Sequence, residues 1–273
     1  MRGQHFLKNK SKLRKIVEAL DLKSGDTVIE IGPGHGELTQ EIRNEKLDIR
    51  IIAIEKDPRL VAWNLKHEAL TNVEIVEGDA LKILPQLCSM LHASSFKIVG
   101  NIPYYITGYL FRILGELENK PEVIVLTIQK EVAERVCARP PKMNLLAASI
   151  QFWAEPKIIG YISKHDFKPQ PKVDSAILKL KMRDEKLSPC GRCPEGTEMR
   201  DNYYYELIKI VFKQPRKTIL NNLVEADLRG LERGSTRINK EELMGILFSI
   251  GINPNDRPQN LSVEHLMDLV QSL

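Results

Sequence analysis

The chain has 273 residues, more than one typical domain of about 150 residues and enough to bury a large core without disulfides. With 42% hydrophobic and 28% charged residues, the composition excludes a fibrous or disordered chain. No apolar run reaches the length of roughly 18 residues that a membrane-spanning helix needs, and no signal-peptide core follows Met1. We therefore expect a cytoplasmic protein with no membrane partner.

The positive charge is concentrated at the N-terminus. The formal net charge is +4, whereas residues 1–15 carry six basic side chains and no acidic one. A polyanion would feel such an arm locally, within a screening length of about 8 Å. The arm is thus a candidate contact for nucleic acid, and the solvated start of an amphipathic helix is the alternative.

From Thr27 onward, short β-branched runs alternate with helical patterns, which is typical of a Rossmann-like α/β fold with a mostly parallel sheet. We predict seven strands, at Thr27–Ile31, Arg50–Glu55, Val73–Glu77, Phe96–Gly100, Val123–Gln129, Lys157–Ile162 and Ala176–Lys181. Helices are expected near Glu37–Glu45, Pro58–Ala69, Tyr109–Leu117 and Glu131–Ala138. Only a loop joins the last two strands, so at least one of them should run antiparallel.

After Arg183 the sequence becomes polar and rich in proline and glycine, as in a linker. Cys190 and Cys193 lie in it, and with no second ligand pair nearby we expect a turn and no metal site. Helical patterns follow at Tyr203–Phe212, Arg216–Asp227, Lys240–Ile250 and Val263–Leu273, with a capping pair at Asn239 and Glu242 and an N-cap at Ser262. The predicted domains are a sheet domain at 1–184, a linker at 185–200 and a small all-helical domain at 201–273.

The first predicted strand runs into a glycine-rich turn with Gly32, Gly34 and Gly36. Glycines there allow a tight turn and a close approach of the backbone to a ligand. A dinucleotide fingerprint would place a third glycine where this chain has Glu37. Because Glu30 and Glu37 would also repel phosphates, the turn favours a nucleoside cofactor without a pyrophosphate.

Two carboxylates follow the next two strands. Glu55 ends the second strand, where a carboxylate can accept both hydroxyls of a ribose, and Asp79 follows the third, near the place of an adenine amino group. Each alone could be a surface or turn residue. Together with the glycine turn, they predict a ligand site at the carboxyl edge of the sheet.

The fourth strand ends in a more specific segment, Asn101-Ile102-Pro103-Tyr104. The Asn101 side-chain oxygen and the Ile102 or Pro103 carbonyl could accept both hydrogens of an exocyclic amine, while Tyr104 stacks on the base. These acceptors would stabilise the positive charge that grows on the nitrogen during methyl transfer. The segment thus favours N-methylation of a planar base.

Five segments together resemble the ribosomal RNA adenine dimethyltransferase family, and within it the KsgA type: Gly3–Leu7, Glu30–Gly36, Val99–Tyr105, Phe167–Ser175 and Phe212–Thr218. The resemblance covers nearly the whole chain. It implies S-adenosylmethionine as cofactor and two adjacent adenosines near the 3′ end of small-subunit ribosomal RNA as target. It also implies a pre-ribosomal small subunit as partner, a monomeric enzyme, and a C-terminal domain that contacts the RNA.

The resemblance also implies roles for single residues. His5 and Leu7 would close over the cofactor, Gly32 would approach its amino-acid portion, Glu55 would bind its ribose and Asp79 its adenine. Asn101 would lie where the cofactor and the target amine meet, next to Pro103. Tyr104 and Phe167 would hold the flipped target base between them.

Three other functions are compatible with parts of this pattern. A macrolide-resistance methyltransferase of the same fold would act on a large-subunit adenine. A mainly non-catalytic ribosome assembly factor would keep the fold and bind RNA without turnover. An NAD-dependent oxidoreductase is disfavoured by the absent third glycine and by the segment from Asn101 to Tyr104.

Overall fold

The computed structural model describes residues 4–66, 73–91, 96–183, 197–226 and 238–273. A seven-stranded sheet forms its centre, as predicted, with every strand core in the predicted place. The strands are β2 (Thr27–Ile31), β3 (Arg50–Glu55), β4 (Val73–Glu77), β5 (Phe96–Asn101), β6 (Val123–Gln129), β7 (Ala154–Ile162) and β9 (Ser175–Met182). Their spatial order is β4-β3-β2-β5-β6-β9-β7.

Strand directions confirm the mixed sheet. β2 pairs in parallel with β3 and β5, and the parallel pairing continues to β4 on one side and β6 on the other. β9 is the antiparallel strand, paired with both β6 and β7. The carboxyl ends of the five parallel strands β2 to β6 therefore share one edge of the sheet.

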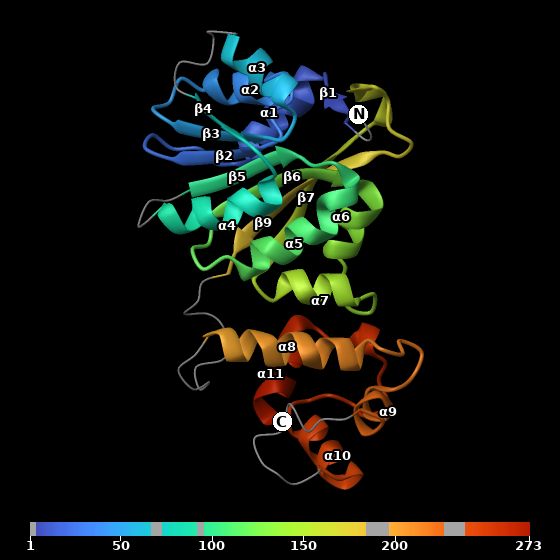
Figure 1. Cartoon of the computed structure of the whole chain (residues 1–273). Helices are drawn as coiled ribbons and strands as arrows, with labels where there is room; N and C mark the ends of the chain where they lie inside the picture. The colour runs from blue at the N-terminus through green and yellow to red at the C-terminus, as the bar shows by residue number, and fades with distance from the viewer. Residues whose placement is uncertain (1–3, 67–72, 92–95, 184–196, 227–237) are drawn as a thin grey trace. The chain divides into compact units, whose positions relative to one another are not determined.

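Helices cover both faces of the sheet (Figure 1). α1 (Lys10–Ala19), α2 (Glu37–Arg43) and α3 (Pro58–Lys66) lie on one face, and α4 (Ala80–Met90), α5 (Thr107–Glu116) and α6 (Lys130–Val136) lie on the other. α1 and α4 were not among the predicted helices. α1 buries Leu13, Ile16 and Val17 at helical spacing, so the basic arm becomes an amphipathic helix from Lys10 onward.

A second, two-stranded sheet joins distant parts of the chain. β1 (Phe6–Leu7) pairs antiparallel with β8 (Phe167–Lys168), and Leu7 lies opposite Phe167. The backbone N–H of Lys8 extends the contact by donating to the Asp166 carbonyl at 2.9 Å. The N-terminal segment is thereby fixed beside the loop that precedes β9.

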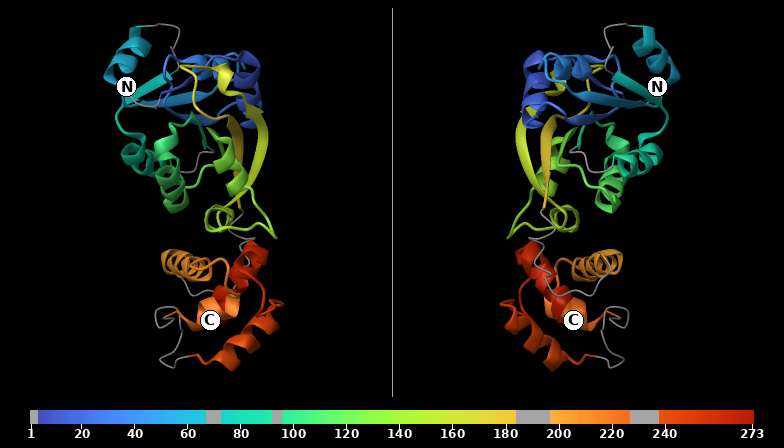
Figure 2. Two further views of the ribbon diagram at one scale, coloured as in Figure 1. Left: turned by 90° about the vertical axis from the view of Figure 1, so that its right-hand side faces the viewer. Right: turned by 90° about the vertical axis from the view of Figure 1, so that its left-hand side faces the viewer.

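The chain divides into two compact units, Met1–Glu134 with Ala154–Met182, and Arg135–Trp153 with Arg183–Leu273. The second unit contains α7 (Leu145–Gln151), α8 (Thr197–Val211), α9 (Ile219–Val224), α10 (Lys240–Ser249) and α11 (Val263–Ser272), visible in both views of Figure 2. Residues 135–153 belong to this unit by their contacts, although the sequence places them in the domain at 1–184. The reason is packing, since Phe152 stacks on Tyr204 with ring centroids 4.0 Å apart.

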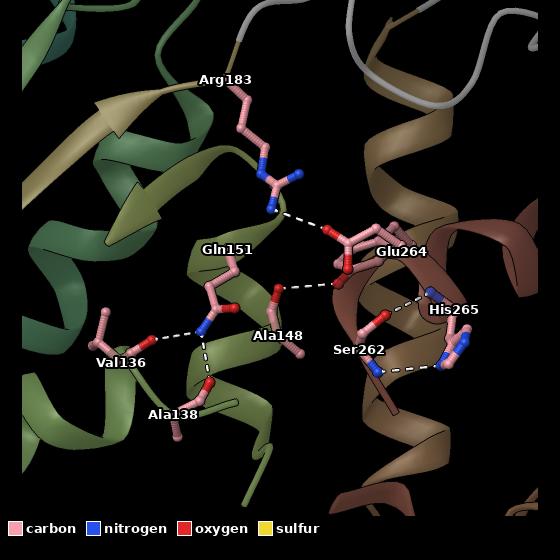
Figure 3. Close-up of polar contacts among 9 residues, drawn as sticks. Val136, Ala138, Ala148, Gln151, Arg183, Ser262, Glu264 and His265 are labelled. Carbon is pink, nitrogen blue, oxygen red and sulfur yellow. Dashed lines mark hydrogen bonds and ion pairs between the residues drawn. The ribbon is translucent and has the colours of Figure 1, made fainter. Parts of the chain in front are cut away.

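Buried hydrogen bonds hold α7 within the helical unit (Figure 3). The Gln151 amide donates to the Val136 and Ala138 carbonyls at 2.8 Å, and the Tyr204 hydroxyl donates to the Ala148 carbonyl at 3.0 Å. An ion pair joins Arg183 and Glu264 at 3.3 Å.

The predicted caps at Asn239 and Ser262 are both present, each as a full capping box. None of the described helices is long and apolar enough to cross a membrane. Gly3, the linker cysteines Cys190 and Cys193, and the end of the helix predicted at Pro58–Ala69 lie outside the described residues.

Candidate active site

A cavity of about 600 Å³ opens at the carboxyl edge of β2, β3, β4 and β5, within the first unit. This volume is in the range typical of small-molecule sites. Nine residues were predicted to form the site, and eight of them line the cavity: His5, Gly32, Glu55, Asp79, Asn101, Pro103, Tyr104 and Phe167. Leu7 is the exception, because its side chain is buried in the hydrophobic core beside α1 and not among the lining residues.

The glycine turn forms the floor of the cavity. Gly32 has a φ of +69°, and a Cβ added there would meet no atom within 4 Å, so it would project into open space. Phe6 packs against Gly34 so closely that a Cβ on Gly34 would lie 2.7 Å from the ring. The turn thus leaves room for a ligand on one side while the N-terminal segment closes the other.

Glu55 is 3% exposed and its carboxylate is held by backbone donors. One oxygen accepts from the Gly34 N–H at 3.2 Å, and the other from the Asp57 N–H at 2.9 Å. Each oxygen keeps a further lone pair for a ligand hydroxyl. The carboxylate is therefore oriented before any ligand arrives.

Asp79 is the N-cap of α4 and accepts from the Leu81 N–H at 3.0 Å. Its second oxygen pairs with Lys56 Nζ at 2.8 Å. The hydrogen bond from Lys56 is the main cause that lowers the pKa of Asp79, and the N-cap contact adds to it, while partial burial opposes both. Asp79 is thus an ionised acceptor at neutral pH, as an adenine amino group requires.

The two carboxylates expected to repel phosphates behave differently. Burial raises the pKa of Glu30 to about 7, against the hydrogen bond from Thr39, which is 2.7 Å long. Glu37 forms an ion pair with Lys8. Neither residue lines the cavity, so the negative charge in the pocket comes from Glu55, Asp57 and Asp79.

Asn101 is anchored by the N-terminal segment. Its side-chain nitrogen donates to the His5 carbonyl at 2.6 Å, which leaves the amide oxygen to accept from a ligand. The Pro103 carbonyl already accepts from the Ile106 N–H at 3.1 Å. The Pro103 carbonyl keeps one further lone pair. Among the described residues no backbone hydrogen bond between elements ends on the Ile102 carbonyl, so of the two acceptors it is the less engaged and the one we place with Asn101 at the target amine.

Two aromatic side chains form the walls beside Asn101. The Tyr104 hydroxyl is 2.9 Å from Ser175 Oγ, and burial raises the pKa of this phenol, so it stays neutral. Phe167 is 6% exposed and is held by the β1–β8 pairing. The His5 ring lies 6.1 Å from the Tyr104 ring, and its Nδ1 contacts the Pro169 carbonyl at 2.8 Å.

The sequence did not single out several lining residues: Phe6, Lys56, Arg59 and Tyr105. Phe6 contacts His35 edge-on, with ring centroids 4.5 Å apart. Lys56 follows Glu55 directly and Tyr105 follows Tyr104, so their closeness to the two motifs was the available signal. Their side-chain directions depend on the tertiary fold.

Two cations of the basic arm are paired with carboxylates in the fold. Lys8 pairs with Glu37, and Arg14 pairs with Glu41 at 3.0 Å. Lys12 donates to the Tyr161 carbonyl at 2.9 Å and keeps its charge. The arm therefore offers less free charge to a polyanion than its composition indicated.

The chain is similar to known proteins over nearly its full length. The family model for ribosomal RNA adenine dimethylases matches residues 2–271. Ribosomal RNA small subunit methyltransferase A of Dehalococcoides mccartyi strain 195 is 38% identical over 96% of this chain and 84% of its own length. The Moorella thermoacetica protein of the same name is 34% identical over 100% of this chain and 91% of its own length.

Two solved structures share the fold across both units. A dimethyladenosine transferase from Plasmodium falciparum has a TM-score of 0.75 and 28% identity, covering 97% of this chain and 96% of that one. The 23S rRNA methyltransferase ErmE has a TM-score of 0.72 at 24% identity, covering 98% and 99%, and shows the fold alone. By its match over nearly its full length, the chain belongs to the ribosomal RNA adenine dimethylase family of S-adenosylmethionine-dependent methyltransferases.

Proposed function

We propose that this enzyme dimethylates N6 of two adjacent adenosines near the 3′ end of small-subunit ribosomal RNA, within a pre-ribosomal small subunit. The orientation of the Asn101 side chain is the main support for this proposal. Its amide nitrogen donates to the His5 carbonyl, which leaves the amide oxygen at the cavity wall to accept a hydrogen bond from the target amine. The relatives named ribosomal RNA small subunit methyltransferase A support the choice of subunit.

The target base fits between two aromatic walls. Tyr104, fixed by Ser175, would stack on one face of the adenine, and Phe167 would cover the other. An enzyme that works on a base must first remove it from its stack, and such stacking supports the extruded base. Contacts with distant segments hold both rings in place, Tyr104 through Ser175 and Phe167 through the pairing of β8 with β1.

Asn101 and the Ile102 carbonyl would accept the two hydrogens of the adenine amino group. The bonds orient the nitrogen lone pair and stabilise the positive charge that the nitrogen gains as the new C–N bond forms. No strong general base is required, because the proton leaves after the bond has formed. S-adenosylmethionine, when bound, supplies an electrophilic methyl group.

Residues in the other half of the cavity fit that cofactor. Glu55 would accept the ribose hydroxyls, Asp79 the adenine amino group, and the open space beside Gly32 would admit the amino-acid portion. His5 would close the cavity near Asn101. Leu7 would act indirectly, by packing the N-terminal segment onto the core.

We further propose that the enzyme works as a monomer in the cytoplasm, where ribosomal subunits are assembled. The helical unit would contact the RNA outside the active site. RNA-binding proteins often read unpaired loops in a structural context, so the assembled particle would supply part of the recognition.

Labelled S-adenosylmethionine tests the proposal. The protein is incubated with undermethylated small subunits and, in parallel, with large-subunit RNA, and the products are digested to nucleosides. Labelled dimethyladenosine from the small subunit alone is the expected result. Label on large-subunit RNA would assign the chain to the resistance type, and RNA binding without transfer would make it an assembly factor.

A further inference from the structure

Two tyrosines outside the predicted site are exposed, and one of them lines the cavity. Tyr105 and Tyr109 are 67% and 69% exposed, among the most exposed large side chains of the described residues. Tyr105 also lines the cavity, directly after the Tyr104 wall. An exposed large ring gives up the free energy of burial, so two such rings within five residues, one of them at the cavity, call for a functional explanation.

The two rings are close along the chain and both are exposed. Tyr105 belongs to the short 3₁₀ turn Tyr104–Ile106, which runs directly into α5, and Tyr109 lies four residues later on the exposed side of that helix. Gly108 lies between them, and a Cβ there would meet nothing within 4 Å, so the surface is open. α5 itself packs on α4 and on the sheet through its opposite face, which includes the buried Leu110 and Leu114.

Basic side chains border the same surface. Lys56 and Arg59 line the cavity with side chains 69% exposed, and each pairs with a carboxylate there, Asp79 at 2.8 Å and Asp57 at 2.9 Å. Arg112, one turn beyond Tyr109, is 75% exposed and pairs with Glu116 at 2.9 Å. Aromatic faces beside basic groups bind single-stranded nucleic acid through stacking on the bases and attraction to the phosphates. Because these three cations are already paired, we expect stacking on the rings to supply most of the contact.

We propose that Tyr105 and Tyr109 form a stacking platform for an unpaired nucleotide that flanks the target adenosine. The inference rests on the proposed function, because a target base that leaves its stack exposes its neighbour. Because Tyr105 lines the cavity, the platform would lie within reach of the nucleotide next to the target adenosine. Because every base has a π-face, the platform would accept the strand without reading its sequence.

Ring-retaining and ring-removing variants at the same positions test the platform. The double variant Tyr105→Leu/Tyr109→Leu keeps apolar bulk but loses the aromatic faces, and Tyr105→Phe/Tyr109→Phe keeps the faces. We expect the leucine variant to raise KM for undermethylated small subunits roughly 10- to 100-fold, the range for lost base stacking. The phenylalanine variant should stay near the wild type, and the Kd for S-adenosylmethionine should be unchanged in both.

Tyr161→Leu is the matched control, since Tyr161 is a tyrosine 47% exposed on the edge strand β7 of the first unit and does not line the cavity. Equal KM in all variants would overturn the proposal, and so would equal losses in the leucine and phenylalanine pairs. A rise in the cofactor Kd that parallels the rise in KM would also overturn it, because Tyr105 would then be a wall of the cofactor site.

A second measurement separates this inference from the proposed function. A short single-stranded oligoadenylate with a central 2-aminopurine reports stacking without any methyl transfer. Quenching by the wild type and the phenylalanine pair, lost in the leucine pair, supports the platform even if small subunits are not methylated. Normal methylation of small subunits with no such difference in quenching or KM would reject the platform and leave the proposed function intact.

Discussion

The two halves of the cavity are built in different ways. In the cofactor half, Asp79 and Glu55 each accept from a backbone N–H two residues further along the chain. In the target half, Asn101 is held by His5, 96 residues away, and Tyr104 by Ser175, 71 residues away. Glu55 and Asp79 also have partners 21 and 23 residues away, Gly34 and Lys56. Local turns and adjacent strands thus orient the cofactor half, whereas the target half depends on segments much further apart in the chain.

This difference separates two kinds of damage. A change in the cofactor half removes one preoriented group and should act mainly on cofactor affinity. A change in the target half also releases a long-range contact, so it should act on methyl transfer and on the order of the N-terminal segment.

Asn101→Ala tests the target half with the largest expected effect. It removes the amide oxygen that accepts from the target amine and the donor to His5. We expect transfer to fall on the order of 10²- to 10³-fold, as for loss of one polar transition-state contact. Single-turnover transfer at saturating cofactor measures the effect, and near-normal turnover would contradict the mechanism.

Glu55→Gln tests the cofactor half. The substitution keeps the size of a nearly buried side chain but removes the charge that accepts ribose hydroxyls. Hydrogen bonds to a charged group contribute about 1.5–3 kcal/mol, so the Kd for S-adenosylmethionine should rise roughly 10- to 100-fold. Calorimetry measures this Kd. The rate of methyl transfer at saturating cofactor should stay within a few-fold of the wild type. A large loss of that rate would show that the two halves do not differ in this way.

Phe167→Leu sharpens the comparison further. Phe167 is 6% exposed and pairs with the N-terminal strand, so truncation to alanine would also leave a cavity in the core. Leucine fills most of that space without an aromatic face. We expect kcat/KM for RNA to fall roughly 5- to 50-fold, in line with lost stacking on one base. The Kd for S-adenosylmethionine should stay constant. An equal loss of cofactor binding would place Phe167 in the cofactor half.

Glu30→Gln probes stability below the glycine turn, and its effect is the smallest. Burial raises the pKa of Glu30 from 4.5 to about 7, so its protonated form suits the fold. The wild type therefore loses stability as pH rises from about 4.5 through 7, by at most about 3 kcal/mol. In thermal unfolding, the melting temperature of the glutamine variant should depend less on pH over this window and should exceed that of the wild type above pH 7. Melting temperatures of the two proteins that change in parallel with pH would contradict the raised pKa.

Patterns that depend on neighbouring residues could be predicted from the sequence. The strand cores, the caps at Asn239 and Ser262, and the clustering of Gly32, Glu55 and Asp79 at one edge follow from alternation, local capping and strand direction. Burial on both faces also explains why the strands β3 and β6 read as nearly continuous apolar runs.

Features set by distant residues were missed. α4 contains Pro85, which usually interrupts a helix, and α7 is only seven residues long. The β1–β8 pair has two residues in each strand, too few for any pattern. The Leu7 side chain packs in the core, which a two-residue strand gives no way to foresee, and its predicted place at the cofactor stays a prediction.

The pairing of β1 with β8 also bears on how the protein is made. The first strand emerges from the ribosome early but has no partner until Phe167 and Lys168 have been synthesised. At 5–20 residues per second, that delay is on the order of ten seconds or more. The active site can therefore be completed only late in synthesis, after the strands β2 to β7 that carry most of its residues have already left the exit tunnel.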